Sequence, residues 1–183
     1  LDVRSDEDPA QWAIPGSLHI NAYEALRVGR PGALARAILP HDRPVVTVCN
    51  AGRVSQTAAA FLVERGFDAR SLVGGMQAWS LAWNTADVPL ADPTVRIIQV
   101  RRTGKGCLSY LVGSDAEAAV IDPSLPADVY VDLARRQGWT IRYVIDTHIH
   151  ADHLSRAREL ARQTGAALLL PAQQRATFPF TAV

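Results

Sequence analysis

The 183-residue sequence has little of what defines several large protein classes. It contains two cysteines, Cys49 and Cys107, and so distant a pair does not form the disulfide framework of small secreted domains. Its formal net charge is only +1, which gives no electrostatic basis for binding nucleic acid. No apolar run reaches the length of about 18 residues needed to span a membrane. These deficits favour a globular protein of a reducing cytoplasm, with neither nucleic acid nor membrane as a partner.

The sequence also lacks an initiator methionine and a signal peptide. Its first residues already have the composition of a strand, so we expect a fragment, a processed form or a partly observed chain. The length accommodates one or two domains. Hydrophobic residues make up 48% of the chain, as in ordinary globular proteins.

A strand–loop–helix pattern around Cys49 organises the first half of the chain. Residues 45–48 are a β-branched run that predicts a buried strand. Residues 55–65 are rich in helix formers and end before Gly66, which predicts a helix. The loop between them would direct backbone N–H groups and the helix dipole towards the Cys49 thiol. A reactive thiolate is therefore favoured over the alternative of a small buried hydrophobic residue.

The loop residues add to this chemistry. Gly52 allows the backbone to curl around the sulfur, and Arg53 adds a fixed positive charge. A persulfide or an anionic sulfur donor suits such a site. The predicted catalytic residue is Cys49, and the predicted substrate-binding residues are those that follow it: Asn50, Ala51, Gly52, Arg53, Val54 and Ser55.

Four ordered segments resemble the rhodanese family of sulfurtransferases over residues 1–90. They are LDVR at residues 1–4, IPGSLHI at residues 14–20, the Cys49 loop, and GGMQAW at residues 74–79. The resemblance implies an α/β fold, a rhodanese-like parallel sheet with helices on both faces, and sulfane sulfur carried as a persulfide on Cys49. Many members of that family hold an arginine directly before the loop serine, where this chain has Val54.

A second domain is predicted after a linker. Residues 84–94 contain two prolines and little periodicity, which is typical of a linker. Beyond it, strands come first, followed by a helix and then by a strand, a loop, a helix over residues 154–164 and a final strand. This order differs from that of the first half, so the domains are predicted to span residues 1–90 and 91–183.

The loop that follows a predicted strand at residues 141–145 is dense in metal-ligand residues. Three of the five histidines lie in it with an aspartate, and the predicted metal ligands are His148, His150, Asp152 and His153. Side chains alternate along an extended segment, so His148 and His150 can point the same way. Imidazole and carboxylate groups suit zinc or non-haem iron, and a metal site is favoured over a solvated polar loop.

This loop, THIHADH at residues 147–153, resembles the motif of the metallo-β-lactamase superfamily. GCLSYLV at residues 106–112 and VIDP at residues 120–123 resemble early strands of the branch that holds persulfide dioxygenases and glyoxalase II-type thioesterases. The resemblance implies the N-terminal part of an αββα domain. Cys107 belongs to the strand pattern and is expected to be structural.

The two resemblances together imply a fused enzyme of sulfur metabolism. The rhodanese half would transfer sulfane sulfur, and the metal half would be a persulfide (sulfur) dioxygenase that oxidises glutathione persulfide to sulfite. That family implies one Fe(II), with His148 as a ligand and the other two ligands further downstream. No His, Cys or Asp follows His153, so the chain is expected to hold an incomplete iron site.

Two other functions remain as alternatives. A zinc thioester hydrolase of the glyoxalase II type would recruit Asp152 and His153 as well, and zinc is accordingly the alternative cofactor. A non-catalytic module would carry sulfur on Cys49 without turnover. The expected partners are small thiols and persulfides such as glutathione persulfide or thiosulfate. A homo-oligomer is left open.

Overall fold

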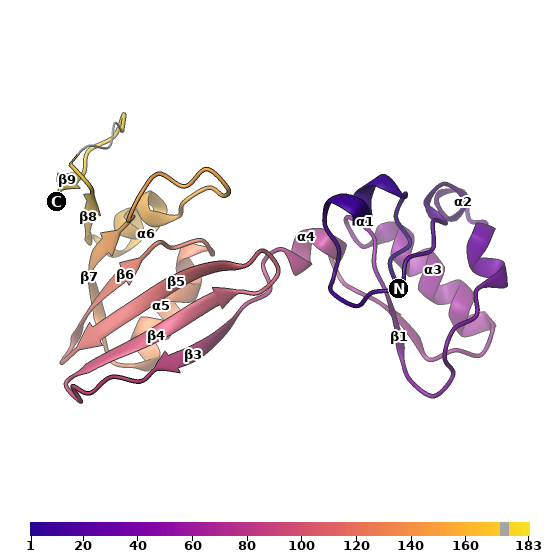
Figure 1. The fold of residues 1–183 in the computed structure, drawn as a ribbon, viewed down its shortest axis with the longest axis horizontal. Coiled ribbons are helices and arrows are strands. Elements are labelled where there is room, and N and C mark those ends of the chain that lie inside the picture. The colour runs from indigo at the N-terminus through magenta and orange to yellow at the C-terminus, as the bar shows by residue number, and fades with distance from the viewer. Residues whose placement is uncertain (173–175) are drawn as a thin grey trace. The chain divides into compact units, whose positions relative to one another are not determined.

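The computed structural model describes residues 1–172 and 176–183 (Figure 1). The chain divides into two compact units, Leu1–Ser80 and Leu81–Val183. Within the described part of the chain, no helix combines the length and the apolar character that a membrane span requires.

The first unit is built on a small parallel sheet. Strand β1 (Val45–Thr47) pairs in parallel with β2 (Ala69–Ser71). Asp2 joins this arrangement through isolated parallel bridges to Val48 and His19. Residues 1–3 and 18–20 therefore contribute single bridges and form no strands of their own. The predicted α/β class with a parallel sheet is confirmed.

Short helices surround this sheet, and one longer helix supplies much of its core. They are α1 (Glu7–Gln11), α2 (Tyr23–Arg27), a 3-10 helix η1 (Gly32–Arg36), α3 (Arg53–Glu64) and α4 (Gly75–Trp79). Ala58 and Leu62 on α3 are fully buried, and they belong to one hydrophobic cluster with Val3 and Leu26. Burial of this apolar face fixes α3 directly after β1, where the Cys49 loop connects the two.

The described part of the second unit contains a mixed seven-stranded sheet in the order β3-β4-β5-β6-β7-β8-β9. The strands are β3 (Asn84–Val88), β4 (Val95–Arg102), β5 (Cys107–Ser114), β6 (Glu117–Ile121), β7 (Thr140–Ile145), β8 (Ala167–Leu170) and β9 (Thr181–Ala182). Pairing is antiparallel from β3 to β6 and parallel from β6 to β9.

The linker prediction over residues 84–94 was wrong in its first half, because Asn84–Val88 forms β3. This segment has weak strand propensity and gains its order from its neighbour β4. The Arg101 side chain on β4 donates a hydrogen bond to Asn84 Oδ1 at 2.7 Å, and Arg96 pairs with Asp87 at 2.9 Å. The local sequence pattern does not predict this pairing, because pairing with an adjacent strand is a tertiary contact.

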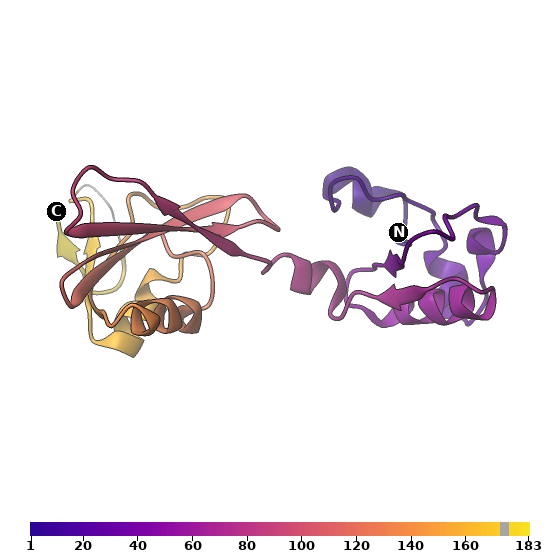
Figure 2. The ribbon, with the colours of Figure 1, turned by 90° about the horizontal axis from the view of Figure 1, so that it is seen from below.

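Helices α5 (Ala127–Arg136) and α6 (Ala157–Thr164) lie on one side of the second sheet (Figure 2). Tyr130 on α5 is fully buried, and its hydroxyl accepts hydrogen bonds from the backbone N–H groups of Ser124 at 2.9 Å and Leu125 at 3.2 Å. The same hydroxyl lies 2.8 Å from Ser109 Oγ on β5. Buried polar groups need such partners, so Tyr130 holds the segment after β6 in place beside the histidine loop.

Candidate functional site

Cys49 lies between the end of β1 and the first turn of α3, as the strand–loop–helix pattern predicts. The residue is 2% exposed. The N–H of Ser55 donates a hydrogen bond to Cys49 Sγ at 3.3 Å, and Ser55 Oγ lies 3.3 Å from the same sulfur. The backbone N–H groups of Ala51 and Gly52 also face it. The sulfur is therefore enclosed by hydrogen-bond donors as well as by apolar atoms.

These donors decide how the thiol ionises. Burial raises the pKa of Cys49, but the Ser55 hydroxyl and the N–H groups of Ser55, Gly52 and Ala51 outweigh burial and bring the pKa below that of an ordinary cysteine. The physical reason is that hydrogen bonds to a charged group stabilise its charged form. The site thus favours a thiolate, which is the nucleophilic form of cysteine.

The start of α4 closes the loop from its other side. The N–H of Met76 donates to Cys49 O at 2.9 Å, and the N–H of Gln77 donates to Asn50 O at 3.0 Å. A Cβ atom on Gly75 would lie 2.0 Å from Cys49 O, so only glycine permits this approach. These contacts explain the GGMQAW segment, because its first residues pack against the loop that holds the thiol.

A buried ion pair holds Asn50, the residue next to the cysteine. Arg4 pairs with Asp2 at 2.6 Å, and the two side chains are 3% and 0% exposed. Arg4 also donates to Asn50 Oδ1 at 3.3 Å and to Trp12 O at 2.7 Å. The LDVR segment at residues 1–4 entered the prediction only through the family resemblance, so this supporting role of Asp2 and Arg4 was not predicted.

Cys49 borders a cavity of about 420 Å³. It is lined by Tyr23, Leu26, Arg27, Cys49, Asn50, Ala51, Arg53, Val54 and Thr57. Four of the predicted substrate-binding residues therefore face this space, whereas Gly52 and Ser55 contact the sulfur itself. Arg27 of α2 was not predicted, and it adds a second guanidinium beside that of Arg53. The combination gives the cavity a positive wall that suits a small anion.

Replacing Ser55 by alanine is expected to raise the pKa of Cys49, because it removes the hydroxyl that stabilises the thiolate. The thiolate fraction at a pH below the pKa then falls, so the pH profile of alkylation by iodoacetamide moves to higher pH. The measurement uses a Cys107→Ser background, in which Cys49 is the only thiol. Ser71→Ala is the matched control, since Ser71 Oγ contacts Ser55 Oγ at 2.8 Å but forms no hydrogen bond to the sulfur. An unchanged profile for Ser55→Ala would contradict this account.

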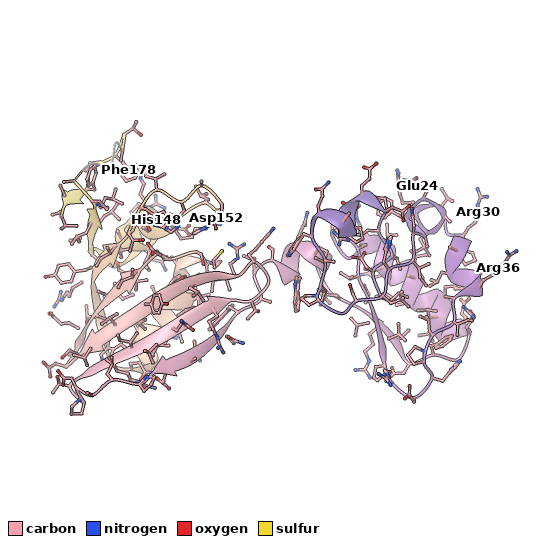
Figure 3. All side chains as sticks on the ribbon, viewed as in Figure 1. Glu24, Arg30, Arg36, His148, Asp152 and Phe178 are labelled. Atoms are coloured by element: carbon pink, nitrogen blue, oxygen red, sulfur yellow. The ribbon has the colours of Figure 1, made fainter. Side chains whose placement is uncertain are left out.

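In the second unit, the three histidines of the predicted metal loop lie together beyond the end of β7. Figure 3 shows His148 and Asp152 on this loop at one end of the sheet. The ring centroids of His148 and His150 are 4.2 Å apart, and those of His150 and His153 are 4.3 Å apart. The clustering expected from the sequence is thus present in the structure.

The four predicted metal ligands nevertheless fall into two groups. One group contains Asp122, His148 and His150, and the other contains Cys107, Asp152 and His153. Within each group, one ligand atom per residue lies within 4.8 Å of those of the other two. Asp122 could have been found from its place after β6, because carboxyl ends of neighbouring parallel strands meet at one sheet edge.

Carboxylate side chains hold the histidines of the first group in position. Asp122 accepts hydrogen bonds from the N–H and the hydroxyl of Thr147 at 2.7 and 2.8 Å, and it lies 3.2 Å from His150 Nε2. Burial raises the pKa of Asp146, although hydrogen bonds from the Ser155 hydroxyl at 2.7 and 2.9 Å oppose the rise. Carboxylates in contact with imidazoles orient metal-binding histidines in many proteins.

The donor atoms of this loop fit a bound metal. The side chain of His153 is 9% exposed, and among the described residues its Nε2 has no hydrogen-bond partner. A buried ring nitrogen without a partner is unfavourable, and a metal ion would satisfy it. The nitrogen and oxygen donors suit zinc, and they suit ferrous iron as well.

Two family models match separate parts of the chain. Residues 1–82 match the rhodanese-like domain, and residues 102–180 match the metallo-beta-lactamase superfamily. The thiosulfate sulfurtransferase GlpE of Pseudoalteromonas translucida (strain TAC 125) is 39% identical over 72 residues, which are 35% of this chain and 69% of the relative. A hydroxyacylglutathione hydrolase of Anaeromyxobacter dehalogenans (strain 2CP-C) is 38% identical over 73 residues, which are 40% of this chain and 28% of the hydrolase.

Solved structures also resemble parts of the chain. A metallo-beta-lactamase from Staphylococcus aureus subsp. aureus COL has 30% identity and a TM-score of 0.43, and the match covers 46% of this chain and 25% of that one. ETHE1 from Myxococcus xanthus has 23% identity and a TM-score of 0.39, with coverage of 55% and 40%. The chain spans less than half of either protein and about a quarter of the hydrolase.

Proposed function

Because the chain belongs to the rhodanese family over residues 1–82 and contains a metallo-β-lactamase domain over residues 102–180, we propose that it is an enzyme of sulfur metabolism that transfers sulfane sulfur through Cys49. The observation that carries this proposal is the Cys49 sulfur surrounded by the N–H groups of Ala51, Gly52 and Ser55. Sulfurtransferases that act on thiosulfate are among the relatives, which supports thiosulfate as the donor.

The reaction has two displacement steps. In the first, the Cys49 thiolate attacks the outer sulfur of thiosulfate, so that an S–S bond to Cys49 forms, the S–S bond of thiosulfate breaks, and sulfite leaves with the electron pair. In the second, a thiolate acceptor attacks the outer sulfur of the Cys49 persulfide and releases the Cys49 thiolate. Each step conserves charge, and no oxidant or reductant is consumed.

The surrounding residues stabilise both anionic states of this cycle. The N–H groups of the loop that favour the thiolate can also bind the terminal sulfur of a persulfide, which is likewise anionic. Arg27 and Arg53 face the cavity and would attract a doubly charged donor. Val54 stands where many family members hold an arginine, so the second guanidinium comes from α2 instead of from the loop.

Replacing Cys49 by serine is expected to reduce sulfur transfer from thiosulfate to cyanide by roughly 10³-fold or more, as in other enzymes that lose their nucleophile. Mass spectrometry of the chain treated with thiosulfate should show one added sulfur atom on Cys49. Cys107→Ser should retain both transfer and the added sulfur. Undiminished transfer in Cys49→Ser would refute the assignment.

For the second unit we propose a metal-dependent activity on glutathione persulfide. The histidine cluster around His148 would hold an Fe(II) ion, which supplies the O₂-dependent oxidation of a persulfide sulfur to sulfite when bound. Asp122 fixes the neighbouring ring, since it contacts His150 Nε2 and is itself held by Thr147. The alternative is a zinc thioester hydrolase that also recruits Asp152 and His153, and it is supported by the 38% identity to the hydroxyacylglutathione hydrolase.

Metal analysis and oxygen uptake separate these activities. The proposal expects iron in anaerobically prepared full-length protein, and O₂ consumption when glutathione persulfide is added to it. If the protein instead holds zinc, hydrolyses a glutathione thioester and takes up no O₂, the dioxygenase proposal is replaced by the hydrolase alternative. A carrier role would instead show the added sulfur on Cys49 without turnover in any of these assays.

A further inference from the structure

Helix α2 places an arginine on the wall of the Cys49 cavity. Tyr23, Leu26 and Arg27 line this cavity, and residues three and four positions apart lie on one face of a helix. Leu26 is 2% exposed, and it belongs to the same buried hydrophobic cluster as Cys49. Because the buried leucine anchors α2, the neighbouring Arg27 is held beside the cysteine, although the two residues belong to distant parts of the sequence.

The charged residues on the cavity wall all have the same sign. Arg27 is the last residue of α2 and Arg53 is the first residue of α3, and no described residue that lines the cavity is acidic. Among the residues that the structure describes, Arg53 has no ion-pair partner. A small ligand in this space would therefore meet two guanidinium groups from two different helices, and a ligand with two negative charges would match them.

Glu24 limits the positive charge that Arg27 presents to the cavity. Nη1 of Arg27 donates hydrogen bonds to the two carboxylate oxygens of Glu24, at 3.2 and 3.3 Å. Glu24 lies on the surface of the first unit (Figure 3), and the side chains of Arg27 and Glu24 are 56% and 77% exposed. An ion pair as exposed as this one is weak, so an anion in the cavity can compete with Glu24 for the guanidinium. The Glu24–Arg27 pair would thus tune the affinity of the cavity for anions.

We propose that Arg27 and Arg53 together bind a small oxyanion with two negative charges, and that Arg27 makes the first unit selective for such a sulfur donor. This inference rests on the proposed sulfur transfer and adds to it the residue that selects the donor. A dianion such as thiosulfate is attracted by both guanidinium groups, whereas a donor with a single charge gains less from the second one. Arg27 acts on the binding of the donor, and the displacement at Cys49 itself is unchanged.

The first test measures anion binding without any sulfur transfer. In the full chain with Cys107→Ser, sulfate at constant ionic strength is expected to slow the alkylation of Cys49 by iodoacetamide, at concentrations at which methanesulfonate, with one charge, has no effect. Arg27→Gln should raise the sulfate concentration for half-protection by about 5-fold, the order of one exposed charge pair, and Glu24→Gln should lower it. Arg30→Gln is the matched control, since it removes the same charge from an exposed residue that does not line the cavity.

The second test compares two sulfur donors that differ in charge. Thiosulfate carries two negative charges and releases sulfite, and methanethiosulfonate carries one and releases methanesulfinate. The ratio of kcat/KM for thiosulfate to kcat/KM for methanethiosulfonate should fall by about 5-fold in Arg27→Gln, through KM for thiosulfate, because only binding of the donor is weakened. Glu24→Gln should raise the same ratio, and Arg30→Gln should leave it unchanged.

The two tests separate this inference from the proposed function. Equal losses with both donors in Arg27→Gln, or sulfate protection that is unaffected by this substitution, would overturn the selective role of Arg27 while sulfur transfer through Cys49 stands. Sulfate protection that depends on Arg27 in a protein without sulfur transfer would instead support the anion site and refute the proposed function.

Discussion

Replacing Gly75 by alanine is expected to destabilise the first unit by about 2–5 kcal/mol and to raise the pKa of Cys49. The added Cβ would lie 2.0 Å from Cys49 O, and its neighbours there are backbone atoms that cannot rotate away. The left-handed conformation at φ +57° adds about 1–2 kcal/mol for a residue with a side chain, and overpacking adds about 1–3 kcal/mol. The loop must then leave α4, and the N–H groups that face the sulfur lose their placement.

Gly66→Ala is the matched control for this change. Gly66 also has a positive φ, +86°, but a Cβ there would meet nothing within 4 Å. It therefore reports the cost of the backbone conformation without the clash. Urea-dependent hydrogen exchange of α3 amides measures the stability of the first unit, and the pH profile of Cys49 alkylation measures the thiol. Equal effects of the two substitutions on the thiol would contradict the role assigned to Gly75.

Replacing Arg4 by methionine is expected to destabilise the first unit by about 3–5 kcal/mol, the usual cost of leaving one partner of a buried ion pair without its charge. Asp2 is fully buried, and it accepts hydrogen bonds from both the backbone N–H and the guanidinium of Arg4. Removal of the guanidinium leaves this carboxylate uncompensated and removes the hydrogen bond to Asn50 Oδ1 beside the cysteine.

Arg70→Met provides the comparison in the same unit. Arg70 and Asp68 form an exposed pair at 3.4 Å, and such pairs contribute roughly 0–1 kcal/mol. Hydrogen exchange of α3 amides should separate the two variants clearly, while amides of β5 in the second unit should be unaffected by either. A double variant with Asp2→Leu and Arg4→Met should recover stability, because an apolar pair removes the unpaired charge. Similar small losses for Arg4→Met and Arg70→Met would show that the buried pair is not essential.

The thiol site could largely be predicted from the sequence because its signals are local. The β-branched run before Cys49 and the helix-forming run that ends at Gly66 predict the turn between them. Both family resemblances are confirmed by the matching family models. The contributions of Gly75 and Arg27 could not be read in the same way, because each comes from another element that reaches the loop only in the folded unit.

The metal loop shows why local spacing was insufficient. Helix α6 was predicted from residue 154 but begins at Ala157. The Ser155 hydroxyl donates a hydrogen bond to Asp146 and accepts one from the N–H of Ala157 at 3.0 Å, which ties Ser155 to the end of β7 before the helix begins. Asp152 and His153 come within ligand distance of Cys107 of β5, while the His153 ring also lies 4.3 Å from that of His150. Which ligands meet therefore depends on tertiary contacts that the spacing within the loop does not reveal.

The enclosure of Cys49, with 2% of its surface exposed, would limit which acceptors can take up sulfur if Cys49 carries it as proposed. An acceptor of that sulfur would reach it through the adjacent cavity of about 420 Å³, which favours a small thiol over a broad, flat protein face. In a Cys49 persulfide, the same enclosure would limit contact of the labile sulfur with bulk water and with larger oxidants. Such enclosure would lengthen the lifetime of the Cys49 persulfide between its formation and the transfer of its sulfur.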